Sequence, residues 1–350
     1  MRRVTALTRP FLMRAIQTSV LFGLVCAALA LRAPVAMANG SSSSPGSTDS
    51  GAHVIGFVKI TEKREIYVDY ERPVPGRPTV VLLNGLTYRV GCWDTFTTAL
   101  EGDGLGILRY DAVGQGETLL KYGIPTDAIS LKDQVEDLRL LLNALGIMDP
   151  VHLVGLSYGG AIDLMFAAQY PERTASVILM APFVGPLASQ DTWIRQQINQ
   201  VHVLYPYNPA TFDELYDYFL KFIIYQTYPA AEPIVLENPF KLEATFRMVQ
   251  GVRKFHAKDI VDQLPAGKVH LMIARKDQYL ENAVHEEFWS QLPASARASR
   301  IYIEGSEHKI PEAVPQFAAD WVRRIVNGDA SISGGATFVG DPKTNSVHRQ

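Results

Sequence analysis

A short glycine-flanked turn around Ser157 constrains the fold of this chain more than any other stretch. Residues 151–156 form an apolar run with β-branched members, which is typical of a buried strand, and apolar residues return at helical spacing from Ala161 onward. Gly155 and Gly159 stand two positions on either side of Ser157. In so tight a turn, the two residues that flank the serine contact the adjoining strand and helix, and a Cβ on either of them would clash. The stretch therefore predicts a strand, a sharp turn at Ser157 and a helix.

This turn has chemical consequences as well as structural ones. It lifts the Ser157 hydroxyl clear of the sheet, and it places the backbone N–H of Tyr158 at a helix N-terminus, where it stabilises an oxyanion. The pattern G-x-S-x-G also occurs in turns without chemistry, but the strand before it and the helix after it are the context that a catalytic serine requires. Ser157 is therefore a candidate nucleophile, and Tyr158 is a candidate oxyanion donor.

The order of elements indicates an α/β fold with a mostly parallel central sheet and helices on both faces. The predicted strands cover residues 53–60, 65–71, 79–83, 107–110, 151–156, 176–180, 268–274 and 300–303. The first two form a hairpin, and helical patterns separate most of the others. Ser130 and Asp133 mark the start of one such helix. The glycine-rich stretch at 102–106 precedes a strand instead of following one, which excludes a nucleotide-binding loop.

The alternation of strands and helices breaks between residues 183 and 256. Three helical patterns occupy this stretch, and the middle helix begins with a capping box at 211–214. Tyrosines are frequent here, at Tyr205, Tyr207, Tyr218, Tyr225 and Tyr228. They either pack the stretch onto the core or line an apolar cleft. We predict a helical lid at 183–256, inserted into a core at 53–182 and 257–327.

Both ends of the chain are predicted to lie outside this core. Several arginines precede the apolar run 20–31, and Ala36-Met37-Ala38 follows it, which is typical of a secretory signal peptide. The run is shorter than the roughly 20 residues that a membrane-spanning helix needs, which disfavours a stable membrane anchor. We expect a signal peptide at 1–38, a flexible leader at 39–52, a mobile C-terminal tail at 328–350, and a periplasmic or secreted protein.

Two further loops carry the residues that a serine nucleophile needs. Its hydroxyl attacks only when a base takes the proton, and the base needs a carboxylate that fixes its tautomer. His308 is the candidate base because it alone among the eight histidines lies in a glycine-containing loop between the last predicted strand and the last helix. Asp277 is the candidate carboxylate because it follows a strand, whereas Asp259 and Asp262 precede that strand. This chemistry needs no metal and no cofactor.

The chain resembles α/β-hydrolase fold serine hydrolases with a helical lid over roughly residues 53–327. The resemblance is carried by the motifs at 84–86, 111–116, 155–159, 277 and 305–308, and the order Ser, Asp, His is the one this fold uses. It implies that the backbone N–H of Leu86 is the second oxyanion donor. Asn84 stands where the family usually has histidine.

We therefore expect an exported hydrolase of carboxylic esters with an apolar portion, acting through an acyl-enzyme on Ser157. Serine in place of aspartate as nucleophile disfavours the haloalkane dehalogenase and epoxide hydrolase branches, and the lack of extra glycines after Gly85 weakens a peptidase assignment. Acyltransferase and C–C bond hydrolase stay open because they use the same three residues. A catalytically silent binding module is the alternative of another class, although such proteins usually lack one of the three. A net charge of −3 gives no basic excess for nucleic acid.

Overall fold

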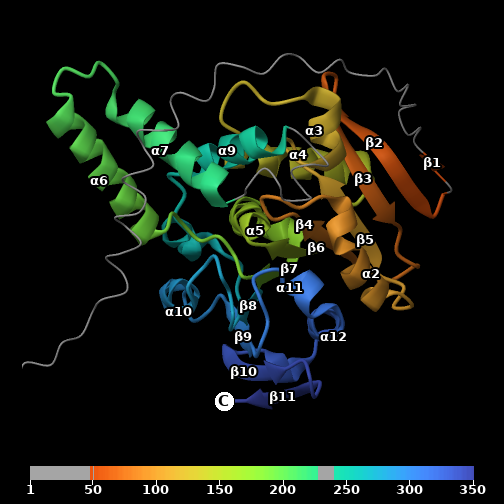
Figure 1. Cartoon of the computed structure of the whole chain (residues 1–350). Coiled ribbons are helices and arrows are strands. Elements are labelled where there is room, and N and C mark those ends of the chain that lie inside the picture. Colours follow the sequence, from red (N-terminus) through yellow and green to blue (C-terminus); the bar gives the residue numbers. More distant parts are fainter. Residues whose placement is uncertain (1–47, 50, 228–239) are drawn as a thin grey trace, which may run out of the picture. The chain divides into compact units, whose positions relative to one another are not determined.

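The computed structural model describes residues 48–49, 51–227 and 240–350, and the strands of this part form one sheet (Figure 1). Its order is β1-β2-β3-β5-β4-β6-β7-β8-β9-β10-β11. The strands are β1 (Thr48–Asp49), β2 (His53–Thr61), β3 (Arg64–Glu71), β4 (Thr79–Leu83), β5 (Gly106–Asp111), β6 (Val151–Leu156), β7 (Thr174–Met180), β8 (Val269–Ala274), β9 (Arg297–Ile303), β10 (Ala336–Asp341) and β11 (Ser346–Arg349). The neighbours from β5 through β4 to β10 pair in parallel, and the pairs outside them are antiparallel. The predicted mostly parallel sheet is confirmed.

Helices connect these strands. The α-helices are α2 (Asp94–Leu100), α3 (Gly116–Tyr122), α4 (Leu131–Ala144), α5 (Tyr158–Gln169), α6 (Ala188–Leu204), α7 (Phe212–Thr227), α9 (Lys241–Val252), α10 (Asn282–Gln291), α11 (Ile310–Ala313) and α12 (Pro315–Val326). The short 3₁₀ helices are η3 (Val90–Trp93), η4 (Pro171–Arg173), η5 (Ala257–Asp259), η6 (Val261–Gln263) and η7 (Ala330–Ile332). The predicted helix start at Ser130 is confirmed, since its hydroxyl accepts a hydrogen bond from the backbone N–H of Asp133 at 3.4 Å.

The sheet is buried on both faces. Val80 and Leu82 of β4 pack in one hydrophobic layer with α2 and α12, whereas Val81 and Leu83 pack in another with α4 and α5. Alternate side chains of a strand point to opposite faces, so one strand serves both layers. This explains why the central strands are continuous apolar runs instead of alternating ones.

Residues 183–256 leave the sheet after β7 and return to it before β8. Within the described part of this stretch, which lacks 228–239, the chain forms α6, α7 and α9, as the helical patterns predict. The capping box is confirmed: Glu214 accepts from the Thr211 backbone N–H at 2.7 Å and donates its own N–H to the Thr211 hydroxyl at 3.2 Å. We call residues 183–256 the helical insertion.

The predicted mobile tail at 328–350 is wrong. After η7, β10 pairs in parallel with β9, and β11 pairs with β10. Phe338 of β10 is buried against Trp321 of α12, with ring centroids 5.2 Å apart. The polar and glycine-rich composition hides an alternation of buried and partly buried residues, which is the pattern of a strand covered on one face.

Two other boundaries also differ from expectation. The predicted flexible leader at 39–52 ends in β1, which pairs with β2, while the predicted signal peptide at 1–38 lies outside the described residues. The sequence predicts one final helix that begins at Pro311 and ends near Gly328. The structure has two helices, α11 and α12, because Val314 precedes Pro315 and a residue before proline is disfavoured in the helical conformation. In the described ranges, no helix has the length and apolar character required to cross a membrane.

Candidate active site

The turn at Ser157 has the strained backbone that the sequence predicts. Ser157 joins β6 to α5 with φ 52° and ψ −112°, which is a conformation that residues with a side chain rarely adopt. A Cβ at Gly155 would clash with the carboxyl group of Asp163, and a Cβ at Gly159 would clash with the carbonyl oxygen of Leu83. Glycine is therefore required on both sides of the serine.

The turn that carries Leu86 lies against this elbow. A Cβ at Gly159 would also come within 3.0 Å of the Asn84 oxygen, and one at Gly85 would lie 3.5 Å from the Leu156 side chain. Tyr88 N–H donates to the Gly85 oxygen at 3.1 Å and closes the turn around Leu86. Among the described residues, neither the Leu86 N–H nor the Tyr158 N–H donates a hydrogen bond. The Leu86 turn and the serine elbow thus each carry a backbone N–H that is unused among the described residues.

Asn84 and Asp111 hold this turn in place. The Asn84 amide donates to Asp111 at 3.3 Å, and its oxygen accepts from the Trp93 indole N–H at 2.7 Å. Asp111 also accepts from the backbone N–H groups of Val90 at 2.8 Å and Glu117 at 2.9 Å. Burial raises the pKa of Asp111 to about 6, although these two N–H groups act in the opposite direction. The sequence alone does not predict these contacts of Asn84, because Trp93 and Asp111 lie 9 and 27 residues away and reach it only in the folded chain.

Asp277 and His308 are brought together from the loops after β8 and β9. His308 Nδ1 lies 2.7 Å from one Asp277 oxygen, and the other oxygen accepts from the backbone N–H groups of Tyr279 and Leu280, each at 2.8 Å. Burial acts to raise the pKa of Asp277, but the hydrogen bonds from His308 and from these N–H groups hold it below its usual value. The carboxylate is therefore ionised at neutral pH and fixes the proton on Nδ1.

Ser157 lies at the same carboxyl edge of the sheet as this pair. β6 and β8 both neighbour β7, and β9 follows β8. Ser157 is partly exposed, and among the described residues its hydroxyl makes no hydrogen bond, so none joins it to His308. In unliganded enzymes catalytic hydrogen bonds are often long and tighten only when substrate binds. Asp259 and Asp262, the rejected carboxylates, are exposed on η5 and η6.

Three other histidines serve the fold: His270 and His285 are buried, and His152 is partly buried. His152 and His270 each lie 2.8 Å from a serine hydroxyl on the neighbouring strand, and burial lowers their pKa values to about 4 and about 3. His285 lies 3.1 Å from the Pro182 oxygen, and burial lowers its pKa to about 4. All three are neutral near pH 7. In the part of the chain that the structure describes, no group of three or more His, Cys, Asp or Glu side chains is arranged to hold a metal ion.

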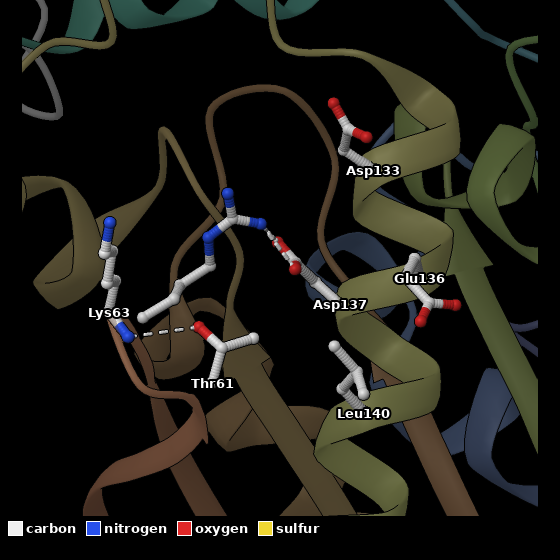
Figure 2. A pocket seen from close by; sticks show the side chains of 7 residues that line it. Thr61, Lys63, Asp133, Glu136, Asp137 and Leu140 are labelled. Atoms are coloured by element: carbon white, nitrogen blue, oxygen red, sulfur yellow. Dashed lines mark hydrogen bonds and ion pairs between the residues drawn. The ribbon is translucent and has the colours of Figure 1, made fainter.

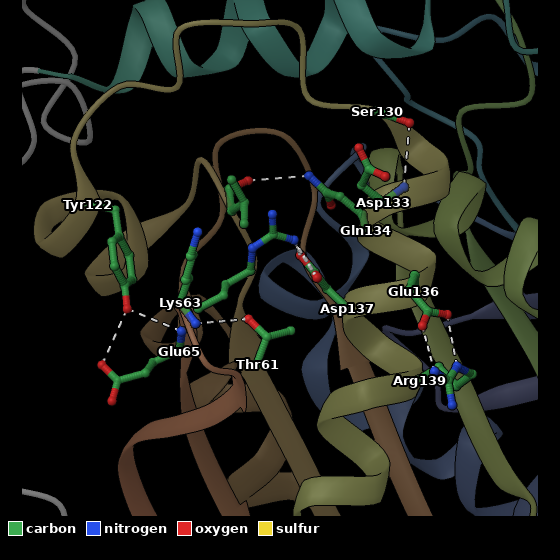
Figure 3. Close-up of polar contacts among 12 residues, drawn as sticks. Thr61, Lys63, Glu65, Tyr122, Ser130, Asp133, Gln134, Glu136, Asp137 and Arg139 are labelled. Carbon is green, nitrogen blue, oxygen red and sulfur yellow. Dashed lines mark hydrogen bonds and ion pairs between the residues drawn. The ribbon is translucent and has the colours of Figure 1, made fainter.

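A charged hollow lies between the β2–β3 turn and α4 (Figure 2). Its lining residues are Thr61, Lys63, Arg64, Asp133, Glu136, Asp137 and Leu140. Arg64 donates to both Asp137 oxygens, at 2.6 and 2.7 Å, and Arg139 donates to Glu136 at 2.5 and 2.8 Å (Figure 3). The Arg64–Asp137 pair joins the hairpin to α4, whereas Arg139 and Glu136 both lie on α4. None of the predicted site residues lies there.

Comparison with known proteins places the chain in a family. A family model described as serine aminopeptidase, S33, matches residues 75–312. The 2-hydroxy-6-oxo-6-phenylhexa-2,4-dienoate hydrolase of Burkholderia cepacia is 34% identical over 111 residues, which are 29% of this chain and 36% of that protein. The homoserine O-acetyltransferase of Trichlorobacter lovleyi is 41% identical over 66 residues, 19% of this chain and 18% of that protein. Each match therefore spans well under half of the relative's length.

The solved structures agree in fold. The crystal structure of MGS-M2, an alpha/beta hydrolase enzyme from a Medee basin deep-sea metagenome library, covers 78% of this chain and 97% of its own, with a TM-score of 0.57 at 20% identity. The family model covers more than half of the chain. The chain accordingly has the α/β-hydrolase fold, and it belongs to the serine aminopeptidase S33 family.

Proposed function

We propose that this protein cleaves carboxylic esters with an apolar portion through an acyl-enzyme on Ser157. One arrangement carries the proposal: the elbow with the strained Ser157 and the adjoining turn with Leu86 each carry a backbone N–H that donates to no described residue, at the sheet edge where an ionised Asp277 orients His308. Such an arrangement supplies a nucleophile, a base with a fixed tautomer, and donors for the negative charge that develops on a carbonyl oxygen.

The chemistry follows from these positions. His308 Nε2 takes the proton of the Ser157 hydroxyl while the serine oxygen attacks the ester carbon. The N–H groups of Leu86 and Tyr158 stabilise the oxyanion of the tetrahedral intermediate. His308 then gives its proton to the departing alcohol, and the acyl group stays on Ser157. Water, deprotonated by His308, attacks the acyl-enzyme and releases the acid and the free serine.

Apolar side chains that share one hydrophobic layer with Leu86 support an apolar substrate. Leu86, Val113, Phe183 and Phe255 are partly buried against the same hydrophobic layer as α4 and α5. The rings of Phe183 and Phe255 stack at the two ends of the helical insertion, with centroids 6.4 Å apart. Ligand sites are mostly lined by such side chains, with a few polar groups that orient the ligand.

A second candidate is hydrolysis of a carbon–carbon bond. It is favoured by relatives named as hydroxy-oxo-dienoate hydrolases in Burkholderia cepacia and Comamonas testosteroni, although each match covers less than half of the relative. The same serine, base and oxyanion donors serve both reactions. Acyl transfer to an acceptor other than water is a third use of the acyl-enzyme.

Labelling with a fluorophosphonate, followed by a substrate panel, tests the proposal. The protein should be labelled at Ser157, and Ser157→Ala should abolish labelling while the protein stays folded. p-Nitrophenyl esters of increasing acyl length should be cleaved with rising kcat/KM. The panel also contains a 2-hydroxy-6-oxo-dienoate and an aminoacyl p-nitroanilide. Turnover of either compound without ester cleavage, or no labelling of folded protein, would refute ester hydrolysis as the function.

We also propose that the protein is exported after cleavage behind Ala38. The arginines, the apolar run and the small residues at 36 and 38 support this. N-terminal sequencing of the protein recovered from outside the cytoplasm should give Asn39 as the first residue. A membrane-retained product that starts at Met1 would instead show an uncleaved anchor.

A further inference from the structure

A buried lysine joins the helical insertion to the oxyanion turn. Lys241 is the first residue of α9 and is only 2% exposed, and its Nζ donates to the Tyr88 carbonyl oxygen at 3.3 Å. Tyr88 is the residue whose N–H closes the turn on Gly85, with Leu86 inside it. The lysine therefore binds the peptide segment that presents the Leu86 N–H.

The position of this lysine is unfavourable by local criteria. Lysine is rarely buried, because its charge loses hydration. A cation in the first turn of a helix also opposes the helix dipole. A tertiary contact must therefore offset both costs. The hydrogen bond to Tyr88 is such a contact, since a charged donor to a carbonyl oxygen is stronger than a neutral one.

The helix that carries Lys241 is itself fixed to the core. The Arg247 carbonyl of α9 accepts from the Ile129 backbone N–H at 2.9 Å. A Cβ at Gly251 would clash with the Ile129 carbonyl oxygen, so the two backbones are in direct contact. Met248 and Val252 are buried in the layer of α4 and α5. Lys241 is thus held by a docked helix and not by a free flap.

The charge of Lys241 also reaches the other support of the turn. It acts to lower the pKa of Asp111, against the larger effect of burial, which raises that pKa to about 6. Asp111 accepts a hydrogen bond from the Val90 N–H, two residues after Tyr88 in the loop that contains Leu86. One buried cation therefore favours the ionised form of the carboxylate that accepts from Val90, and it bonds directly to Tyr88.

We propose that Lys241 is a positioning residue, through which the helical insertion sets the Leu86 N–H for the oxyanion. The inference rests on the proposed function of Leu86 as a donor. An oxyanion donor acts at 2.7–3.1 Å from the developing charge, so a small shift of the turn lowers transition-state stabilisation. Substrate binding elsewhere in the site does not depend on this N–H.

The test compares Lys241→Met with Lys241→Arg and with a matched control, Lys221→Met. Lys221 lies on α7 of the same insertion and pairs with Glu243 at 2.5 Å on a partly exposed surface. We measure kcat and KM with the best p-nitrophenyl ester, and the affinity of an alkyl boronic acid, which forms a tetrahedral adduct with the serine. Thermal unfolding verifies that each variant is folded.

Lys241→Met should lower kcat about 10- to 100-fold, less than the 10²–10³-fold loss that follows removal of an oxyanion donor. KM should stay within about twofold, and boronate affinity should fall with kcat, because only tetrahedral species use the donor. Lys241→Arg, which keeps a donor, should lose less, and Lys221→Met should be unchanged. If Lys241→Met does not fold, Lys241→Leu, which also lacks a donor, replaces it, with the same expectation.

Two outcomes overturn the inference: unchanged kcat and boronate affinity in the folded Lys241 variant, or an equal loss in Lys221→Met. An increase in the KM of Lys241→Met with unchanged kcat also overturns the inference, because it indicates a role in substrate binding. Wild-type labelling at Ser157 is measured first. Its absence defeats the proposed function, whereas normal labelling with an unaffected Lys241→Met defeats only the role of the lysine.

Discussion

Replacing Asp277 by asparagine separates catalysis from folding at this site. One carboxylate oxygen accepts from the Tyr279 and Leu280 N–H groups, and the amide oxygen of asparagine can keep both hydrogen bonds. The amide NH₂ then takes the place of the oxygen that lies 2.7 Å from His308 Nδ1. Two N–H donors cannot face each other, so the imidazole proton must move to Nε2, with Nδ1 as the acceptor.

This tautomer cannot deprotonate Ser157. In a comparable triad the same change lowers kcat on the order of 10⁴-fold, or about 5.5 kcal/mol of barrier. The cost in folding is much smaller, because two of the three hydrogen bonds to residue 277 survive and the third changes direction without being lost. A change in one hydrogen bond is worth about 1 kcal/mol of net stability. Asp277→Asn should therefore remain folded while its turnover nearly disappears.

Turnover of a p-nitrophenyl ester and unfolding in urea measure the two effects on one sample. Asp259→Asn and Asp262→Asn are the controls, since both side chains are exposed and lie before β8. They should keep wild-type kcat. Near-normal turnover of folded Asp277→Asn, together with an inactive Asp259→Asn or Asp262→Asn, would show that the orienting acid is assigned wrongly.

Three shorter predictions concern the scaffold of the site. Gly159→Ala should abolish fluorophosphonate labelling and cost about 1–3 kcal/mol in urea unfolding, because its Cβ would clash with the Leu83 carbonyl oxygen. Asp163 is fully buried without a hydrogen-bond partner among the described residues, and burial raises its pKa well above the usual value. The folded state therefore keeps the Asp163 proton, whereas the unfolded state releases it above about pH 4, so the free energy of unfolding falls as pH rises. Asp163→Asn should be more stable than the wild type at pH 8 but not at pH 4. Burial lowers the pKa of His270 from 6.5 to about 3, so the stability it contributes above pH 6.5 is lost as pH falls toward 3, and His270→Gln should flatten that part of the unfolding profile.

Much of the site follows from local pattern and sheet geometry. Ser157 is marked by two glycines that the backbone contacts require. The carboxyl ends of parallel strands meet at one edge, which is why the loops after β8 and β9 bring Asp277 and His308 together across 31 residues. Local periodicity alone would not have paired them. The chemical requirement for a base and an orienting carboxylate selected them from the other histidines and aspartates.

The supports of the oxyanion turn were not predictable in the same way. Asn84 stands where the family usually has histidine, but its bond to the Trp93 indole depends on the path of η3. Lys241 gives no local signal, because a lysine on an amphipathic helix is normally solvated. Its burial depends on the close approach of α9 to Ile129. Tertiary contacts that bring a polar side chain to a main-chain oxygen leave no period in the sequence.

The C-terminal strands β10 and β11 show that a glycine-rich composition can wrongly predict a mobile tail, and their packing can be tested by mutation. The polar, glycine-rich composition of 328–350 predicts a mobile tail. However, a Cβ at Gly340 would clash with the Phe317 ring, so glycine permits β10 to lie against α12. Phe338, 4% exposed, fills the same layer as Trp321. Truncation of a buried aromatic ring removes its transfer free energy and leaves a cavity, so Phe338→Ala should lower the free energy of unfolding by about 3–5 kcal/mol. Thr344→Ala, on the exposed turn between β10 and β11, is the control and should change it by less than about 0.5 kcal/mol. Equal stability of Phe338→Ala and wild type in urea would restore the mobile tail, since a residue in a free tail contributes nothing to the folded core.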